Sequence, residues 1–428
     1  MKKIRLLHLS DIHFQRPGSI GHDPDYALRE ELRADVEKIV ATRGALDAIV
    51  VTGDIAFSGS KPQYDEAERW LDALADTGGC GREMVYVCPG NHDVDRDYIV
   101  KNSPVKDMHR SIRGEANNEE RERQLLIRLG EDTARELIFK PLTEYNEFAA
   151  RYNCAFFADD RYAWDSEDLI LNDGSVLKIR GLNSALLSGP GDNKGSLFLG
   201  KRACTITRRP GVEYLTICHH PPSWLMDGAE AELALRNRAR IMLFGHEHNQ
   251  RIDFRRDSVT LYAGAVNPAR DEAPWTPGYN MIEVWIETSN DQRQLHVEVV
   301  AREWQEDPTQ FRNHEDTNNR PTHKHHYELG PWTAPEPAEV LVTPKSGSNS
   351  ESTTNDTEDV IVPPMRRIVN EFFRLSISKK SAIAGSLDLL DDSEKGLPEV
   401  QRFTRALERA RQRGKLAQLW KMTTDQRH

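Results

Sequence analysis

Short apolar runs alternate with longer amphipathic segments over the first 330 or so residues. Runs of Val, Ile and Leu at successive positions are typical of strands that are covered on both faces. Amphipathic stretches at 26–42 and 62–76 predict helices between the early strands. The predicted strands span 4–9, 48–52, 84–88, 176–182, 214–218, 241–244, 259–263, 281–286 and 295–301. This alternation predicts a layered α/β domain.

Two later segments change the pattern. Residues 106–150 form a long, charged stretch that predicts a helical insertion, either a cap or a side subdomain. Residues 333–364 are rich in Pro, Ser, Thr, Asn and acidic residues, a composition that cannot bury enough apolar surface to fold, so they predict a flexible linker. Helical spacing returns at 365–428, with Gly414 as an expected helix end. We therefore expect an α/β domain at 1–332 and a small all-α domain at 365–428.

Composition and charge narrow the class of protein. The chain has 428 residues, and 57 Lys and Arg against 68 Asp and Glu give a net charge of −11, which argues against a protein held to nucleic acid by bulk charge. Residues 363–428 carry 14 basic and 8 acidic residues, a balance of +6, so the remainder carries −17. The sequence lacks an apolar run of about 18 residues, so we expect no membrane association. Five widely spaced cysteines favour a reducing cytoplasm over a disulfide framework.

Five short polar motifs follow or end predicted strands. In an extended segment residues i and i+2 point the same way, so Asp11 with His13, and His246 with His248, can each present two ligands to one side. Loops at the carboxyl ends of strands in an α/β sheet converge on one crevice. The motifs are Asp11-Ile12-His13, Gly53-Asp54, Gly90-Asn91-His92-Asp93, His219-His220-Pro221-Pro222 and Gly245-His246-Glu247-His248.

The donor types in these motifs favour a pair of metal ions. Two ions about 4 Å apart need more ligands than one loop supplies, and one ligand must bridge them. Asp54 is the natural bridge, because a carboxylate offers two oxygens and a negative charge. A mixed nitrogen and oxygen set suits Mn, Fe or Zn better than Ca or Mg. The five motifs contain no cysteine, so a structural zinc cluster is not expected.

The order DxH, GD, GNHD, a histidine after a strand, and GHxH resembles the calcineurin-like metallophosphoesterase family, over about residues 4–270. The resemblance implies a two-sheet β-sandwich flanked by helices. It also implies that His92 is the catalytic histidine, which protonates the leaving oxygen, and that Asn91 and His92 contact the substrate. One metal ion would be held by Asp11, His13, Asp54 and His248, and the second by Asp54, Asn91, His219 and His246.

Other polar residues near the motifs have structural explanations. We expect His220 to face away from the site and Asp93 to orient a ligand rather than to act as one. Glu247 is expected to point outward. The cluster at His323, His325 and His326 lies outside the motif order, and we expect a solvated strand end there rather than a third metal site.

The C-terminal segment resembles a different kind of module. Its stretches at 378–384 and 409–420 look similar to the small helical death-like or effector-associated adaptors of bacterial conflict systems, which are joined by linkers to enzymes and pair with a like module. Two alternatives are a helical domain with a merely solubilising role and a nucleic-acid-binding face that uses the +6 balance. Phosphate contacts would weaken steeply with salt, whereas recruitment by a protein would not.

These observations predict a cytoplasmic, dinuclear metal-dependent phosphoesterase that hydrolyses phosphodiesters of nucleic acid or nucleotides. Two divalent ions, with Mn the first choice and Fe or Zn the alternatives, would neutralise the phosphate and make a nucleophile from water at neutral pH. The insertion and the tail favour a nuclease or a bacterial defence effector recruited through the C-terminal domain, while the acidic charge argues against a grip on long DNA. The alternatives are a cyclic-nucleotide phosphodiesterase and a non-catalytic metal-bound assembly protein.

Overall fold

The computed structural model describes residues 1–15, 25–157, 162–167, 169–267, 275–290, 292–315, 319–334 and 362–426. The chain divides into two compact units, Met1–Pro331 and Trp332–His428.

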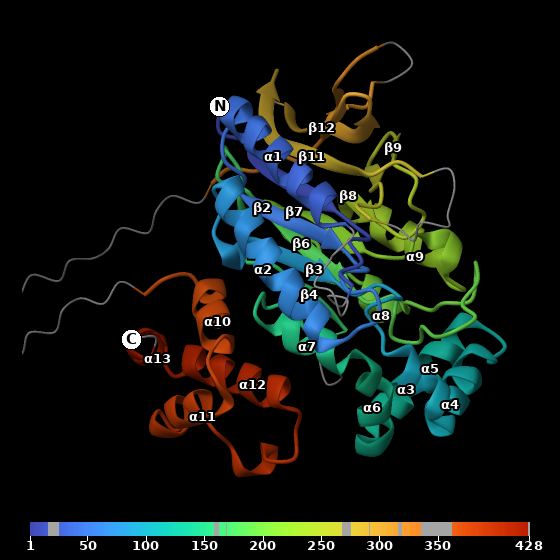
Figure 1. Ribbon diagram of the computed structural model, residues 1–428, viewed down its shortest axis with the longest axis vertical. Helices are drawn as coiled ribbons and strands as arrows, with labels where there is room; N and C mark the ends of the chain where they lie inside the picture. Colours follow the sequence, from blue (N-terminus) through green and yellow to red (C-terminus); the bar gives the residue numbers. More distant parts are fainter. Residues whose placement is uncertain are drawn as a thin grey trace, which may run out of the picture. The chain divides into compact units, whose positions relative to one another are not determined.

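The larger unit is built on two seven-stranded sheets (Figure 1). The first has the order β13-β12-β11-β1-β2-β3, with β14 also paired to β12, and the second has the order β4-β6-β7-β8-β10-β9, with β5 paired to β6. Strand β3 contacts β6 and β7, and β2 contacts β7, so the sheets face one another, as the family resemblance implied. The first sheet comprises β1 Ile4–Leu9, β2 Ala48–Thr52, β3 Val85–Cys88, β11 Gly278–Ser289, β12 Gln292–Glu306, β13 Thr309–Asn313 and β14 His323–Glu328. The second comprises β4 Ala163–Asp165, β5 Leu169–Ile170, β6 Val176–Leu182, β7 Val212–Cys218, β8 Ala239–Phe244, β9 Arg251–Phe254 and β10 Val259–Tyr262.

Parallel pairing gathers the motif loops. Strands β1, β2 and β3 run parallel to one another, as do β6, β7, β8 and β10. Strands β2 and β3 are buried at every position, which explains their unbroken apolar sequences. The five polar motifs follow β1, β2, β3, β7 and β8, each at the carboxyl end of a parallel strand.

Helices pack on the outside of this sandwich. Helices α1, Tyr26–Arg43, and α2, Lys61–Gly78, contact each other and run along the first sheet in Figure 1. Helix α2 begins with a capping box between Ser60 and Gln63 and has Pro62 in its first turn, where the missing amide costs nothing. On the second sheet, α9, Gly228–Arg236, contacts β8 and the short α8, Lys201–Cys204.

The helical insertion begins earlier than the sequence predicted. It comprises α3 Arg96–Lys101, α4 Ser103–Arg113, α5 Asn118–Gly130, α6 Asp132–Phe139 and α7 Thr143–Ala150. The start is earlier because two capping side chains precede the charged stretch. Asp95 accepts a hydrogen bond from the backbone N–H of Tyr98, and Asn102 accepts one from Val105.

The sheets also extend beyond the predicted strands. The β11–β12 hairpin continues to the pair Ser289–Gln292 at its turn, so the backbone pairing carries polar residues that no apolar pattern marks. Strands β4, β5, β9 and β13 were not predicted, because they are short or polar. The histidines at 323–326 lie in β14, which pairs with β12, in agreement with the expected strand.

The smaller unit is helical, with α10 Met365–Phe373, α11 Ile377–Ser386, α12 Glu399–Gln412 and α13 Leu416–Asp425. Ile368, Phe372 and Phe403 are fully buried in its core. Gly414 follows α12 with a φ of +66°, and the N–H of the next residue donates to Ala410 O at 2.8 Å, which ends the helix as predicted. Most of the expected linker, 335–361, lies outside the described residues. Within the described part of the chain, no helix has both the length and the apolar character needed to cross a bilayer.

Candidate metal centre

Backbone hydrogen bonds tie the motif loops of the two sheets together. The N–H of Asp11 donates to Gly53 O at 3.1 Å, and the N–H of His13 donates to Asp54 O at 3.0 Å. Asp11 also accepts a hydrogen bond: the N–H of Asn267 donates to Asp11 O at 2.9 Å. This bond joins the segment after β10, in the second sheet, to the loop after β1, in the first. These bonds place the side chains of separate loops around one point.

Five of the proposed ligands have a left-handed backbone. The φ angles are +53° at Asp11, +52° at His13, +51° at Asp54, +69° at His246 and +53° at His248. Such a conformation costs about 1–3 kcal/mol for a residue with a side chain and persists only where the surroundings enforce it. Here the bonds between the loops enforce it, and the resulting turns direct the side chains toward one another.

Two motif glycines allow the loops to approach this closely. A Cβ atom on Gly90 would lie 2.1 Å from Asp54 Oδ1, and one on Gly245 would lie 1.9 Å from Ser10 Oγ. Any side chain at either position would push a ligand-bearing loop away. Both glycines are therefore needed for packing, beyond their role in turns.

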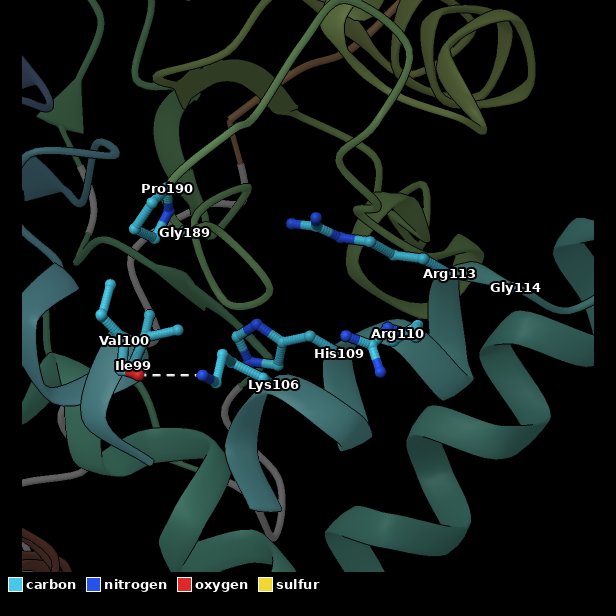
Figure 2. A pocket seen from close by; sticks show the side chains of 9 residues that line it. All are labelled: Ile99, Val100, Lys106, His109, Arg110, Arg113, Gly114, Gly189 and Pro190. Atoms are coloured by element: carbon cyan, nitrogen blue, oxygen red, sulfur yellow. Dashed lines mark hydrogen bonds between the residues drawn. The ribbon is translucent and has the colours of Figure 1, made fainter. Parts of the chain in front are cut away.

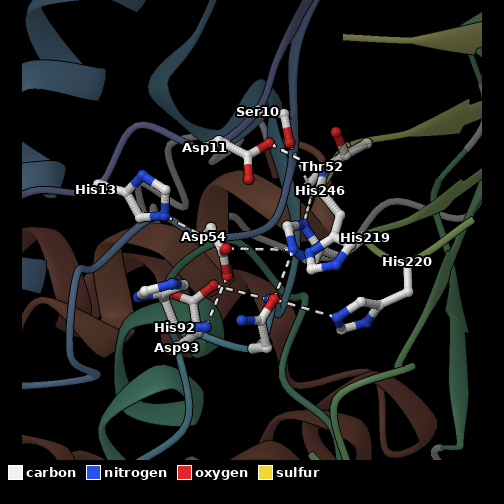
Figure 3. A network of polar contacts seen from close by, with 12 residues as sticks. Ser10, Asp11, His13, Thr52, Asp54, His92, Asp93, His219, His220 and His246 are labelled. Atoms are coloured by element: carbon white, nitrogen blue, oxygen red, sulfur yellow. Dashed lines mark hydrogen bonds and ion pairs between the residues drawn. The ribbon is translucent and has the colours of Figure 1, made fainter. Parts of the chain in front are cut away.

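Asp54 occupies the middle of the polar network (Figure 3). Its Oδ2 atom lies 3.3 Å from His13 Nε2 and 3.3 Å from His219 Nε2. Its Oδ1 atom accepts the backbone N–H of His92 at 2.7 Å. The carboxylate is buried, with 1% of its residue surface exposed. It therefore stands between histidines from both sheets, as a bridging ligand must.

The remaining predicted ligands flank Asp54. On one side, His248 Nε2 lies 3.2 Å from Asp11 Oδ1. On the other, Asn91 Oδ1 lies 3.1 Å from His219 Nε2. The Nε2 atom of His246 is buried and has no hydrogen-bond partner in the described part of the chain. An unpaired buried nitrogen is costly unless a ligand satisfies it.

These donors fit metal ions. Three groups have ligand atoms within 4.8 Å of one another: His13, Asp54 and His92; Asp11, Asp54 and His219; and His219, His220 and His246. Imidazole nitrogens, carboxylates and one amide form the mixed set that suits Mn, Fe or Zn. The structure thus brings all seven predicted metal ligands into one cluster, and Asp54 belongs to two of the three groups.

The electrostatics of the cluster favour ionised carboxylates. Burial alone would raise the pKa of Asp11 and Asp54, but hydrogen bonds and charge from the surrounding histidines hold both below their ordinary value. Burial likewise opposes protonation of His219, yet the charge and hydrogen bond of Asp54 raise its pKa to about 9. Burial, helped by the charge of His219, lowers the pKa of His246 to about 3, so this ring is neutral.

His92 lies at the edge of the cluster. Its Nδ1 atom is 2.8 Å from Phe57 O, and its ring centroid is 4.7 Å from that of His13. An Nδ1–H that donates to the carbonyl leaves Nε2 to face a substrate. Burial lowers the pKa of His92 below its ordinary value. This position beside the ligands fits the role predicted for the catalytic histidine.

The prediction that His220 faces away is wrong. Its Nε2 atom lies 3.2 Å from Asn91 Oδ1, and its Nδ1 atom lies 2.8 Å from Ser184 Oγ. Strand β7 ends at Cys218, so the alternation of side chains no longer applies to the two histidines after it. Both rings therefore turn toward the cluster.

The expectation for Asp93 agrees with the structure, whereas that for Glu247 agrees only in part. Asp93 accepts backbone hydrogen bonds from Gly90 and Ala56, each at 2.9 Å, and another from Tyr64 Oη at 2.9 Å. It therefore fastens the loop after β3 to the loop after β2. Glu247 belongs to none of the groups of potential ligand atoms, but it pairs with Lys194 at 3.3 Å and lines the cavity over the cluster, so it does not point outward.

A cavity of about 620 Å³ opens over the cluster. Several of its lining residues were not predicted from the sequence. Arg96 lies shortly after the GNHD motif, and Trp224 lies shortly after the HHPP motif. This nearness in the sequence is the one signal that could have identified them as lining residues. Trp224 packs edge-on against His246, with ring centroids 4.0 Å apart. The other unpredicted lining residues are Gly189, Pro190, Gly191, Asp192, Lys194 and Asn249.

Comparison with known proteins agrees with this site. Residues 4–250, more than half of the chain, match the model of the calcineurin-like phosphoesterase family. The chain therefore belongs to the calcineurin-like phosphoesterases, a family of phosphoester hydrolases that generally bind two divalent metal ions. Residues 364–425 match the model of the GTPase-associated adaptor domain.

Individual relatives are distant. The uncharacterized metallophosphoesterase-like protein YydB of Bacillus subtilis (strain 168) is 32% identical over 95 residues, which cover 22% of this chain and only 18% of that protein. A predicted phosphoesterase from Streptococcus pneumoniae TIGR4 is 11% identical, with 77% of this chain and 99% of that chain covered and a TM-score of 0.29. Vps29 from Chaetomium thermophilum is 9% identical, with 76% and 100% covered and a TM-score of 0.30.

Proposed function

We propose that this protein is a dinuclear metal-dependent phosphodiesterase that acts on nucleic acid or nucleotides. The observation that carries the proposal is the position of Asp54, whose Oδ2 atom faces His13 and His219, residues of the two different proposed ion sites. The first ion would be held by Asp11, His13, Asp54 and His248, and the second by Asp54, Asn91, His219 and His246. We propose Mn for both, with Fe or Zn as alternatives.

Each protein group has a defined task in this proposal. The two ions, when bound, supply positive charge to the phosphate and lower the pKa of water. Asn91 and His92 contact the phosphate, and His92 passes a proton from Nε2 to the departing oxygen. Arg96, which lines the same cavity, adds positive charge beside the substrate. Asp93 keeps these residues in place through its bonds to the two loops.

The first experiment is hydrolysis of bis(p-nitrophenyl) phosphate with added Mn²⁺. The wild type is compared with Asp54→Ala and with a control, Asp97→Ala, whose carboxylate is on the exposed surface of α3. We expect the Asp54 variant to lose activity and the control to keep it. Equal rates in all three proteins would favour the alternative of a non-catalytic, metal-bound assembly protein.

A substrate panel separates the proposed substrates. Linear DNA, RNA and cyclic AMP are incubated in parallel with the Mn²⁺-loaded protein, and the products are resolved by chromatography. Cleavage of DNA or RNA supports a nuclease. Cleavage of cyclic AMP alone supports the alternative, a cyclic-nucleotide phosphodiesterase.

We propose that the C-terminal unit binds a protein partner and so recruits the phosphoesterase to it. We further propose that this recruitment serves bacterial defence. The match of residues 364–425 to the GTPase-associated adaptor domain supports this proposal. Exposed apolar residues such as Ile377, at 56% exposure, offer a contact surface. Light scattering over a concentration series tests pairing with a like module, and Ile377→Asp should abolish any pairing, whereas Leu233→Asp, an equally exposed change in the larger unit, should not.

A further inference from the structure

A second pocket, of about 570 Å³, lies beside helix α4 (Figure 2). Three of its nine lining residues are cations, and none is acidic, although the larger unit is acidic as a whole. The lining residues are Ile99, Val100, Lys106, His109, Arg110, Arg113, Gly114, Gly189 and Pro190. A concave surface with this charge favours an anion.

One loop separates this pocket from the cavity over the metal centre. Gly189 and Pro190 line both spaces. Asp192 lines the cavity over the metal centre, and its Oδ1 atom accepts a hydrogen bond of 2.9 Å from Arg113, which lines the pocket beside α4. The two spaces are therefore neighbours, and the Arg113–Asp192 pair holds the loop between them.

The pocket also contains buried polar groups without partners. His109 is 5% exposed, and its Nε2 atom has no hydrogen-bond partner among the described residues. The Nε atom of Arg113 is also buried and has no hydrogen-bond partner among the described residues. Figure 2 shows the His109 ring among the cationic side chains that α4 directs into this space. Buried polar groups are nearly always paired, so these two atoms indicate a ligand.

The other two cations make bonds only at the exposed surface. Lys106 Nζ bonds to Val100 O at 2.9 Å, and Arg110 pairs with Asp107 at 3.1 Å on the exposed surface of α4. Exposed pairs of this kind are weak and exchange easily. A phosphate that entered the pocket would meet an ammonium group and a guanidinium group, which bind phosphate oxygens strongly.

We propose that this pocket binds a second phosphate of the same substrate molecule whose scissile phosphate lies at the metal centre. The proposal rests on the proposed function and refines it. A cyclic mononucleotide has one phosphate and cannot fill both sites, whereas an oligonucleotide carries phosphates at regular intervals along one chain. The preferred substrate is therefore an oligonucleotide, and α4 selects for it.

Binding is tested with the full-length protein in EDTA, by fluorescence anisotropy of a labelled ten-residue oligo(dT). The variant Lys106→Gln/Arg110→Gln removes two pocket cations and leaves Arg113 in place. The control Lys101→Gln/Arg123→Gln makes the same charge change at exposed positions of α3 and α5 that line neither space. The conservative variant Lys106→Arg/Arg110→Lys keeps the charge.

We expect the pocket variant to bind the oligonucleotide at least about tenfold more weakly than the control, and the conservative variant to retain binding. Each lost phosphate contact lowers the slope of log K against log salt by about 0.7 for a single strand, so loss of the one phosphate in the pocket should lower the slope by about 0.7. Equal binding by the pocket variant and the control would overturn the proposal.

Hydrolysis separates this proposal from the proposed function. With Mn²⁺, the ratio of kcat/KM for oligo(dT) to that for bis(p-nitrophenyl) phosphate should fall at least about tenfold in the pocket variant. An unchanged ratio would overturn the second-phosphate site while the phosphodiesterase proposal stands. If no substrate is hydrolysed but the binding difference persists, the proposed function fails and the anion site remains.

Discussion

The two carboxylate oxygens of Asp54 have different partners. Oδ1 accepts the backbone N–H of His92 at 2.7 Å, whereas Oδ2 faces the Nε2 atoms of His13 and His219. One side chain thus fixes the loop that carries the proposed catalytic histidine and stands between the two proposed ion sites. Its loss should affect the ions and the position of His92 together.

Asp54→Ala should lower kcat/KM for bis(p-nitrophenyl) phosphate by more than the roughly 10²- to 10⁴-fold that the loss of a general acid costs, because both ions lose a ligand. The bound metal, measured by mass spectrometry after gel filtration, should fall below one ion per chain. A variant that retains two ions would show that Asp54 is not the bridge.

His92→Asn should separate proton transfer from metal binding. We expect kcat to fall by about 10²- to 10⁴-fold while the metal content remains that of the wild type. The loss should be smaller for p-nitrophenolate, which leaves without a proton, than for an alkyl ester, whose alkoxide needs one. An equal loss for both leaving groups would argue that His92 only contacts the phosphate.

Metal binding should release protons at neutral pH. Asp54 raises the pKa of His219 to about 9, so in the metal-free protein this ring carries a proton below that pH, but only the neutral ring can bind an ion. Affinity should therefore rise with pH up to about 9. Calorimetric titration of Mn²⁺ in two buffers with different ionisation enthalpies counts the protons, and a count of zero at pH 7.5 would contradict the assignment of His219 as a ligand.

Phe57 should contribute to the binding of aromatic substrate groups. Its side chain is 42% exposed although its ring centroid lies only 5.4 Å from that of His92. Stacking of a base on an aromatic ring contributes about 1–3 kcal/mol. Phe57→Ala should therefore raise KM for an oligonucleotide at least about fivefold, with a smaller effect on kcat. Phe57→Tyr serves as the matched control, and an equal KM in the two variants would exclude stacking.

The sequence was sufficient to select the side chains that the structure brings into one cluster. Each motif follows an apolar strand, and parallel pairing of β1 with β2 brings Asp11 and Asp54 together. His219 follows β7 in the other sheet and joins them through the packing of the two sheets, which the family resemblance implied and no local pattern did. The same patterns failed for His220. Its orientation depends on a hydrogen bond to Ser184, a residue 36 positions away whose proximity only the folded sheets establish.

The residues that line the two pockets were less predictable, because their positions also depend on contacts between residues that are distant in the sequence. Arg113 and Asp192 are 79 positions apart and belong to no motif, yet their ion pair holds the loop between the two pockets. The start of the insertion depends on Asp95 and Asn102, and such residues are equally common in ordinary turns. Tertiary contacts, rather than periodicity, decide these features.

Five proposed ligands have a left-handed backbone that lowers the stability of the fold while it directs their side chains toward the proposed ion sites. They are Asp11, His13, Asp54, His246 and His248. Glycine would adopt these φ angles without strain, so glycine at any one of the five positions would relieve backbone strain and at the same time remove a proposed metal ligand. A lineage released from the need for hydrolysis would therefore drift toward glycine at these positions. All five residues carry side chains that can coordinate a metal ion, so the strained backbone and the proposed ion sites coincide in this chain.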